Sequence, residues 1–264
     1  GQQIATSGGI TVTASSGSIT GSGRLVSGVA SLTGSGNNNS DSATSGNITL
    51  NAGNAGVSLS GANAVTIGAA SINDASGSAT TGNLSVTSGG PINTSGTPLQ
   101  IQFGASTNDV SGTPSTGTEG TLALSSTSTG GVFANWTLGN LSTNRITTLS
   151  AAAANQAIEI TNSAGIITVN NAVSAGDDTL LLKTTGATKD IVFNNAAAAL
   201  TSTAGMADSV KLQATGAITF TSSAATAVNT STGNGGVTLV ADSIARGAEA
   251  INAGTGRVTF APNS

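Results

Sequence analysis

A short motif recurs along this chain, in which a Gly, Asn or Asp turn precedes two apolar residues that flank one small polar residue. Clear copies occupy residues 46–50 (GNITL), 82–86 (GNLSV), 216–220 (GAITF) and 256–260 (GRVTF). Alternation over so few positions is the period of a half-buried β-strand, and the turn residues limit the strand's length. A chain made of many such strands is typical of a repeat architecture.

The composition favours one elongated domain spanning residues 1–264. Charged residues make up 7% of the chain and aromatic residues 2%, so the core must be thin and built from small side chains. The regular apolar pairs and a net charge of only -4 argue against a disordered chain. A minor break near 104–144 is the alternative, because Pro114 interrupts the strand spacing there and six of the seven basic residues lie from Arg145 onward.

The spacing of the apolar pairs predicts an all-β fold, a parallel β-helix or β-solenoid. Val57 and Val65, about eight residues apart, match neighbouring sides of one coil. Separations of about 19 to 23 residues, such as Ile191 to Val210, match one full coil. This period predicts roughly a dozen coils and a rod about 55–60 Å long at ~4.8 Å per coil.

Two other folds compete with a solenoid. An antiparallel sandwich would favour two-residue turns such as Asn-Gly, and only Asn234-Gly235 offers one. Short helices are suggested by the alanine runs at 151–154 and 196–199, but both runs are too short to nucleate a helix. We therefore expect these runs to form corners of coils.

Both ends of a solenoid are open sheet edges, and uncovered edges recruit other strands. Neither end of this sequence resembles an amphipathic cap. We therefore expect either flanking repeats or end-to-end or lateral association of identical copies.

The sequence limits the available chemistry. Without Cys or His, the usual Ser-His and Cys-His nucleophiles and zinc sites are excluded. We expect no catalytic residues, no cofactor and no bound metal. The adjacent Asp177 and Asp178, and the group Lys183, Lys189 and Asp190, are the nearest approach to a carbohydrate-cleaving site. The simpler interpretations are a solvated corner for the two aspartates and a surface salt-bridged corner for the second group.

Three weaker binding hypotheses remain. Asn37, Asn39 and Asp41 offer oxygen ligands for a single cation in a polar loop. Trp136, with Phe133 nearby, is a candidate carbohydrate or docking contact, although a lone Trp also suits the interior of a widened coil. Thr-x-Thr pairs such as 11–13 suggest ice binding, but they do not recur at the expected period.

Residues 46–72 (GNITLNAGNAGVSLSGANAVTIGAASI) and 235–262 (GGVTLVADSIARGAEAINAGTGRVTFAP) resemble the shaft repeats of filamentous-haemagglutinin-like adhesins, large bacterial exoproteins of the two-partner-secretion type. The resemblance covers most of the chain and is specific to architecture. It implies a right-handed parallel β-helix, secretion to the bacterial cell surface, and a role in adhesion, biofilm or filament building. The secretion-domain motif of the family, NPNG or NPNL, is missing, so the resemblance implies a shaft segment.

Together these observations predict an extracellular structural or adhesive protein. Its expected partners are flanking repeats, identical copies, and glycans of a host or matrix surface. Basic residues scattered singly make nucleic acid an unsuitable partner, and no apolar run is long enough to insert into a membrane. The alternative is a carbohydrate-active β-helix enzyme, a polysaccharide lyase or hydrolase, or one of the phage-spike type.

Overall fold

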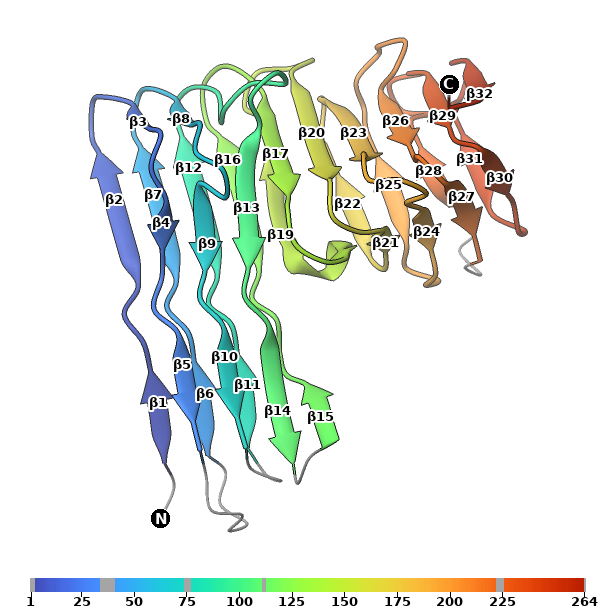
Figure 1. The fold of residues 1–264 in the computed structure, drawn as a ribbon. Coiled ribbons are helices and arrows are strands. Elements are labelled where there is room, and N and C mark those ends of the chain that lie inside the picture. Colours follow the sequence, from blue (N-terminus) through green and yellow to red (C-terminus); the bar gives the residue numbers. More distant parts are fainter. Residues whose placement is uncertain (1–2, 34–40, 74–76, 111–112, 222–225, 264) are drawn as a thin grey trace.

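The computed structural model describes residues 3–33, 41–73, 77–110, 113–221 and 226–263, and it is a parallel β-solenoid (Figure 1). Every pair of named strands in these ranges is parallel except β14 (Ser106–Val110) with β15 (Thr113–Thr116). Within each sheet a strand pairs with the equivalent strands of the neighbouring coils, in register except for shifts between β16 and β19 and between β28 and β31. The predicted fold class is confirmed.

One sheet runs the whole length of the solenoid. Its nine strands are β4 (Leu25–Val26), β9 (Val65–Ile67), β13 (Leu99–Phe103), β17 (Val132–Trp136), β20 (Ala157–Asn162), β23 (Thr179–Thr184), β26 (Val210–Gln213), β29 (Val237–Val240) and β32 (Val258–Ala261). Nine strands at about 4.8 Å each span about 43 Å, so the rod is shorter than the predicted dozen coils.

In the N-terminal half, a second sheet of the body lies opposite this one. Its strands are β2 (Ile10–Ala14), β7 (Ile48–Ala52), β12 (Leu84–Ser88), β16 (Leu122–Ser126) and β19 (Ile146–Ser150). The short strands β3 (Ile19–Gly21) and β8 (Val57–Leu59) form a two-stranded sheet.

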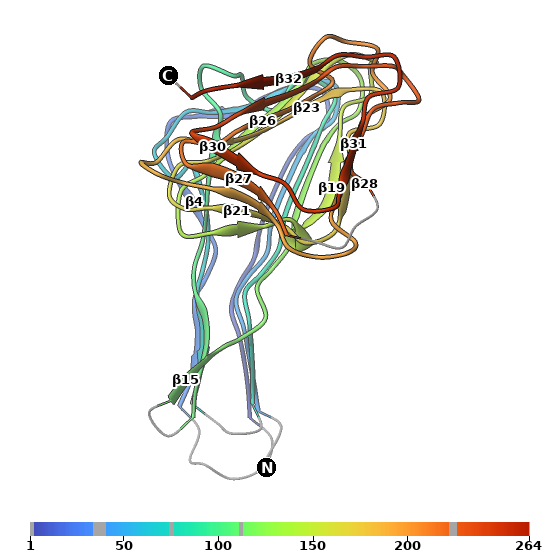
Figure 2. The same ribbon diagram turned by 90° about the vertical axis from the view of Figure 1, so that its right-hand side faces the viewer.

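The same coils extend sideways into a two-layered projection, which we call the leg (Figures 1 and 2). One layer contains β1 (Ile4–Thr6), β6 (Ser42–Thr44) and β11 (Ser78–Thr80), and the other contains β5 (Ala30–Leu32), β10 (Ala70–Ile72), β14 and β15. The leg has its own small core, separate from that of the body, formed by Ala30, Ala43, Ala70, Ile72 and Ala79. Because these side chains are mostly methyl groups, the two layers pack closely.

The C-terminal half has no leg and is three-sided, as Figure 2 shows from its end. Beside the long sheet, one side contains β18 (Leu141–Ser142), β21 (Ile167–Val169), β24 (Ile191–Phe193), β27 (Ala217–Phe220) and β30 (Ser243–Ala245). The other contains β22 (Ala172–Ser174), β25 (Ala199–Thr201), β28 (Thr226–Asn229) and β31 (Ala250–Asn252). A single turn of 3-10 helix, η1 (Thr143–Arg145), lies where the two cross-sections meet.

Coil length differs between the halves and from the prediction. Coils with a leg take 36 to 38 residues, as from Ile10 to Ile48. Three-sided coils take 21 to 30 residues. The predicted coil from Ile191 to Val210 was wrong, because β24 and β26 lie on different sides of the solenoid, and the equivalent of Ile191 one coil later is Ile218.

The apolar pairs fill the interior, as their alternation predicts. Ile48, Leu50, Leu84 and Leu122 are among the fully buried side chains and stack on their equivalents in neighbouring coils. Two members of the pairs depart from this pattern: Leu138, which follows the end of β17 at Trp136 and is exposed, and Phe260, which is exposed on the last strand. The two alanine runs form turns and bends instead of helices.

Candidate functional site

Trp136 and Phe133 do not form a surface pair. Both lie on β17, where alternate side chains point to opposite faces. Trp136 points into the core and is 3% exposed, and Phe133 points outward and is half-buried. The prediction that Trp136 stacks on a carbohydrate is wrong, because its ring has no accessible face; the alternative, that Trp136 fills the interior of a coil, agrees with its burial.

The proposed cation loop falls largely outside the described residues, which include neither Asn37 nor Asn39. Asp41 is described and is 4% exposed. One of its carboxylate oxygens accepts a hydrogen bond from the Gln3 backbone N–H at 2.7 Å. Within the described ranges, no three His, Cys, Asp or Glu residues come together in a group able to hold a metal ion.

The acidic residues suggested for carbohydrate cleavage are held by backbone groups. The two oxygens of Asp178, which is 1% exposed, accept hydrogen bonds from the backbone N–H groups of Ala151 (3.2 Å) and Gln156 (2.9 Å). Burial raises the pKa of Asp178, and these two amides lower it in part. Asp190 accepts from the Ala217 N–H at 2.7 Å. Both carboxylates therefore fix corners of the solenoid to the neighbouring coil.

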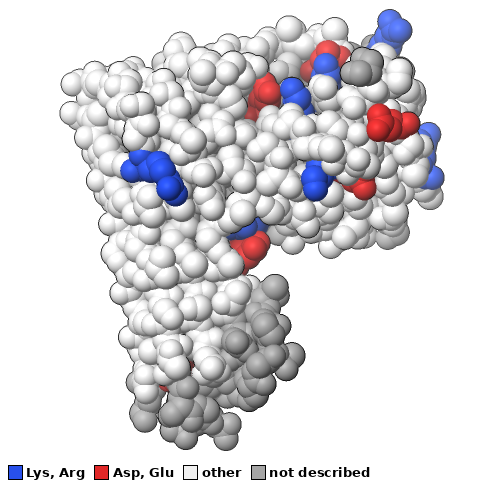
Figure 3. Space-filling model, viewed as in Figure 1, with Lys and Arg blue, Asp and Glu red and all other residues white. Residues whose placement is uncertain are grey.

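Charged side chains are concentrated on the C-terminal half of the face in Figure 3. Lys183 and Lys211 lie on outward positions of the neighbouring strands β23 and β26, where Lys211 is opposite Leu181 and Lys183 is opposite Gln213. The N-terminal half of this face is almost free of charge. On the sheet opposite, the outward residues of β2, β7 and β12 are all Ser, Thr or Asn.

A column of glycines lies where the leg leaves the body, in every coil that has a leg. Gly8, Gly46, Gly82 and Gly120 stack directly on one another, since a Cβ at any of the last three would lie 1.9 to 2.2 Å from the carbonyl oxygen of the glycine before it. Only glycine can occupy such a close approach of backbones. This column lets the chain bend from the leg into β2, β7, β12 and β16.

Buried hydroxyl groups cross the interior beside this column. Ser45 Oγ donates to the Gly68 carbonyl at 2.6 Å and accepts from the Gly82 N–H at 2.8 Å. Thr81 Oγ1 accepts from the Gly120 N–H at 2.7 Å. Each hydroxyl thus satisfies backbone groups that the bend removes from the sheet ladders, as buried polar groups require.

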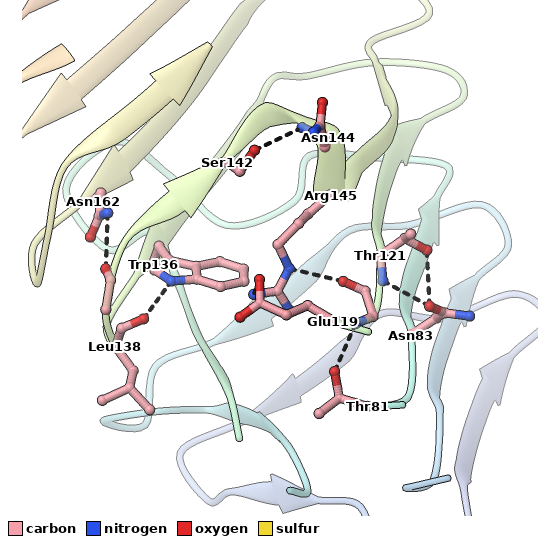
Figure 4. A network of polar contacts seen from close by, with 12 residues as sticks. Thr81, Asn83, Glu119, Thr121, Trp136, Leu138, Ser142, Asn144, Arg145 and Asn162 are labelled. Atoms are coloured by element: carbon pink, nitrogen blue, oxygen red, sulfur yellow. Dashed lines mark hydrogen bonds and ion pairs between the residues drawn. The ribbon is translucent and has the colours of Figure 1, made fainter. Parts of the chain in front are cut away.

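Arg145 ends the column, at the point where the leg stops (Figure 4). Its side chain is 7% exposed and its Nε donates to the Gly120 carbonyl at 2.9 Å. The guanidinium lies 4.3 Å from the ring centre of Phe103 and 4.6 Å from that of Trp136. These rings stack on each other with centroids 4.9 Å apart.

The charge of Arg145 is only partly compensated. Its Nη1 lies 3.0 Å from a carboxylate oxygen of Glu119, whose side chain is 52% exposed. Its Nη2 is buried and has no hydrogen-bond partner among the described residues. Burial lowers the pKa of Arg145 to about 10, and Glu119 raises it in part. Arg145 therefore stays charged at neutral pH, held by two aromatic faces and one carbonyl.

Sequence reasoning offered a minor break near 104–144 as an alternative, but it did not identify the glycine column or the role of Arg145. The glycine spacing of 38, 36 and 38 residues was present in the sequence and matches the true coil length. Arg145 carried no comparable signal, because a single basic residue is usually solvated.

The two end faces of the solenoid expose the interior. We call the surface formed by the first coil the head face and that formed by β30, β31 and β32 the tail face. Inward apolar residues are only partly buried there, namely Ile10, Val12, Ala14 and Leu25 at the head and Ile244, Ile251 and Val258 at the tail. Phe260 on β32 is 54% exposed and borders a hollow of about 380 Å³.

Comparison with known proteins gives no relative: no family model, no curated protein and no solved structure matches this chain. Among the described residues, no helix is long and apolar enough to cross a membrane.

Proposed function

We propose that this chain is a segment of an extracellular bacterial filament or adhesin shaft, structural and adhesive in role and without enzymatic activity. The observation that supports this proposal most is the sheet of nine parallel strands, with an apolar interior that reaches both end faces. A continuous backbone ladder resists bending, and open end faces favour stacking against further coils.

The distribution of charge supports the same proposal. Enzymes that cleave polysaccharides need carboxylates free to act on the sugar. Here Asp178 and Asp190 accept hydrogen bonds from the backbone. The uncharged outer face of the N-terminal half, rich in Ser, Thr and Asn, suits contact with flanking repeats, further copies or surface glycans.

Immunogold labelling of intact cells that express the parent gene tests the location. Antibodies raised against the purified chain should label the outside of the cell, on filaments or in the matrix. Labelling only after permeabilisation would contradict the proposal.

An oligosaccharide-degradation screen tests the competing proposal of a carbohydrate-active β-helix enzyme. We expect no turnover. Turnover that is abolished by Asp177→Asn or Asp190→Asn, with the variants still folded by circular dichroism, would replace the shaft proposal by the enzyme proposal.

A further inference from the structure

The cross-section of the solenoid changes once along its axis, from coils with a leg to three-sided coils. The sheet that holds β2 and β7 ends at β19, and the layers of the leg end at β11 and β15. Only the long sheet continues through the junction. The head and tail faces therefore present different outlines to any coil that stacks on them.

The chain closes the leg on the side that faces the three-sided half. β15 pairs antiparallel with β14 and covers the edge of that layer. β15 also contains Pro114, which has no N–H to offer a further strand. At the base of the leg, Arg145 occupies the end of the glycine column. A fifth coil with a leg cannot be added at this position.

The tail face is less closed than the leg, because no further strand of the described chain covers its edge. The edge strand β32 reads VTFA and has neither a charge nor a proline within it, although Pro262 follows it directly and has no N–H to offer. The carbonyl groups of Arg257 and Ala261 accept hydrogen bonds from Val237 and Ala241 of the preceding coil, at 2.9 and 3.2 Å. Because backbone groups alternate in direction along a strand, the N–H groups of Val258 and Phe260 point to the open side.

The coils beneath the tail face define what would cover it. Val210, Val237 and Val258 stack in one ladder, and Leu212, Leu239 and Phe260 stack in the next. A further coil that continues these ladders would bury the exposed Phe260 ring and pair the two open N–H groups. The head of a second copy matches only the long sheet and would leave its leg unsupported.

We propose that the tail face is a docking surface for one further three-sided parallel β-coil, with branched aliphatic or aromatic residues facing inward, and not for the head face of a second copy. This inference rests on the proposed shaft function and makes the segment an adaptor between two kinds of shaft.

Appending coils to the full chain tests the proposal. One variant carries a second copy of residues 241–261 directly after Ala261, which adds one three-sided coil. The matched control carries residues 65–100 at the same place, which adds one coil with a leg in the same phase of the long sheet, because Gln100 and Ala64 occupy the register position of Ala261. Hydrogen exchange is then measured at the Val258 and Phe260 amides.

The three-sided coil should slow exchange at both amides by on the order of tenfold or more, and the control should leave it unchanged. Phe260→Pro, which removes one open donor, should abolish the protection of the appended coil. Equal protection by both coils, or by neither, would overturn the proposal.

Sedimentation velocity on the unmodified chain addresses the excluded partner. We expect no linear polymers. Polymers that are lost both in Phe260→Pro at the tail and in Thr11→Pro at the head would contradict the proposal, because they would require head-to-tail stacking. If the tail accepts the three-sided coil but intact cells are not labelled by the antibodies, the shaft function fails while the docking surface stands.

Discussion

The guanidinium of Arg145 lies over the ring of Trp136, 4.6 Å from its centre, and both side chains are buried at the one place where the solenoid changes shape. Trp136 is the only tryptophan in the chain, so its fluorescence reports on this junction alone. Arg145 lies at the end of the glycine column, where its Nε donates to the Gly120 carbonyl. The coils with a leg thus end at a charged residue that is buried in the core.

Arg145→Ala should lower the free energy of unfolding by about 2–4 kcal/mol, because it leaves a cavity against Phe103 and Trp136 and frees the Gly120 carbonyl. Urea unfolding followed by Trp136 fluorescence measures this. Arg24→Ala is the control, since the exposed Arg24 donates only to Thr66 Oγ1 at 3.1 Å, and it should change stability by no more than about 0.5 kcal/mol. Equal effects of the two variants would contradict the role of Arg145 at the junction.

Gly82→Ala tests the glycine column. The added Cβ would lie 2.2 Å from the Gly46 carbonyl oxygen, so the backbones of two coils must separate. We expect a loss of about 1–3 kcal/mol, seen as a lower midpoint of thermal unfolding by circular dichroism. Gly17→Ala, where a Cβ meets nothing within 4 Å, should leave the midpoint almost unchanged. A similar midpoint for both variants would show that the column tolerates side chains.

The apolar ladders were predictable from the sequence, because two apolar residues that flank one polar residue in a strand must lie on the same face. Ile218 and Phe220, for example, are buried on β27 as their alternation predicts. The coil length was not predictable from these pairs, because strands such as β25 contain a single apolar residue, Leu200, between small or polar neighbours. Counting only the strong pairs therefore took Ile191 to Val210 as one full coil, although the coil that starts at Ile191 ends at Ile218.

The leg and the junction were beyond the same reasoning for a different physical reason. The strands of the leg read SAT at Ser42–Thr44 and again at Ser78–Thr80, and so small an interior gives no hydrophobic signal. The sequence interruption around Pro114 did indicate a change of structure, and β15 closes the leg there. The role of Arg145 was not predictable, because the contact of its guanidinium with Phe103, on a strand of an earlier coil, is visible only in the structure.

Asp178 gives a pH-dependent prediction. Its pKa in the folded chain lies above its ordinary value of 3.8, chiefly because of burial. Between these two values the folded chain binds more protons than the unfolded chain, so the free energy of unfolding should rise as pH falls through this window. Denaturant unfolding at a series of pH values measures the slope, and Asp178→Asn should flatten it. An unchanged slope in Asp178→Asn would assign the pH dependence to another group.

At neutral pH, Asp178→Ala should cost about 1–3 kcal/mol, because the N–H groups of Ala151 and Gln156 lose their acceptor. Asp178→Asn should cost less, since its amide oxygen can still accept one of the two hydrogen bonds. Asp177→Asn serves as the control at the adjacent position and should change stability by no more than about 0.5 kcal/mol. The loss of unfolding free energy should therefore be largest for Asp178→Ala, smaller for Asp178→Asn and smallest for Asp177→Asn. The reverse order would mean that the charge of Asp178 destabilises the fold more than its hydrogen bonds stabilise it.

The leg should unfold separately from the body, because its core of small side chains is not part of the main core. Ala79→Leu adds three carbon atoms between the two layers at a position that is 1% exposed, so the layers must move apart at a cost of about 1–3 kcal/mol. Hydrogen exchange should accelerate in β6, β10 and β11 and stay unchanged in β23 and β26. Ser71→Leu adds a comparable bulk on the outer face of β10, where Ser71 donates to Ser31 Oγ at 3.0 Å, and should leave exchange in the leg nearly unchanged. Faster exchange throughout the chain in Ala79→Leu would instead mean that leg and body unfold as one unit, and that the leg contributes to the stiffness of the whole shaft.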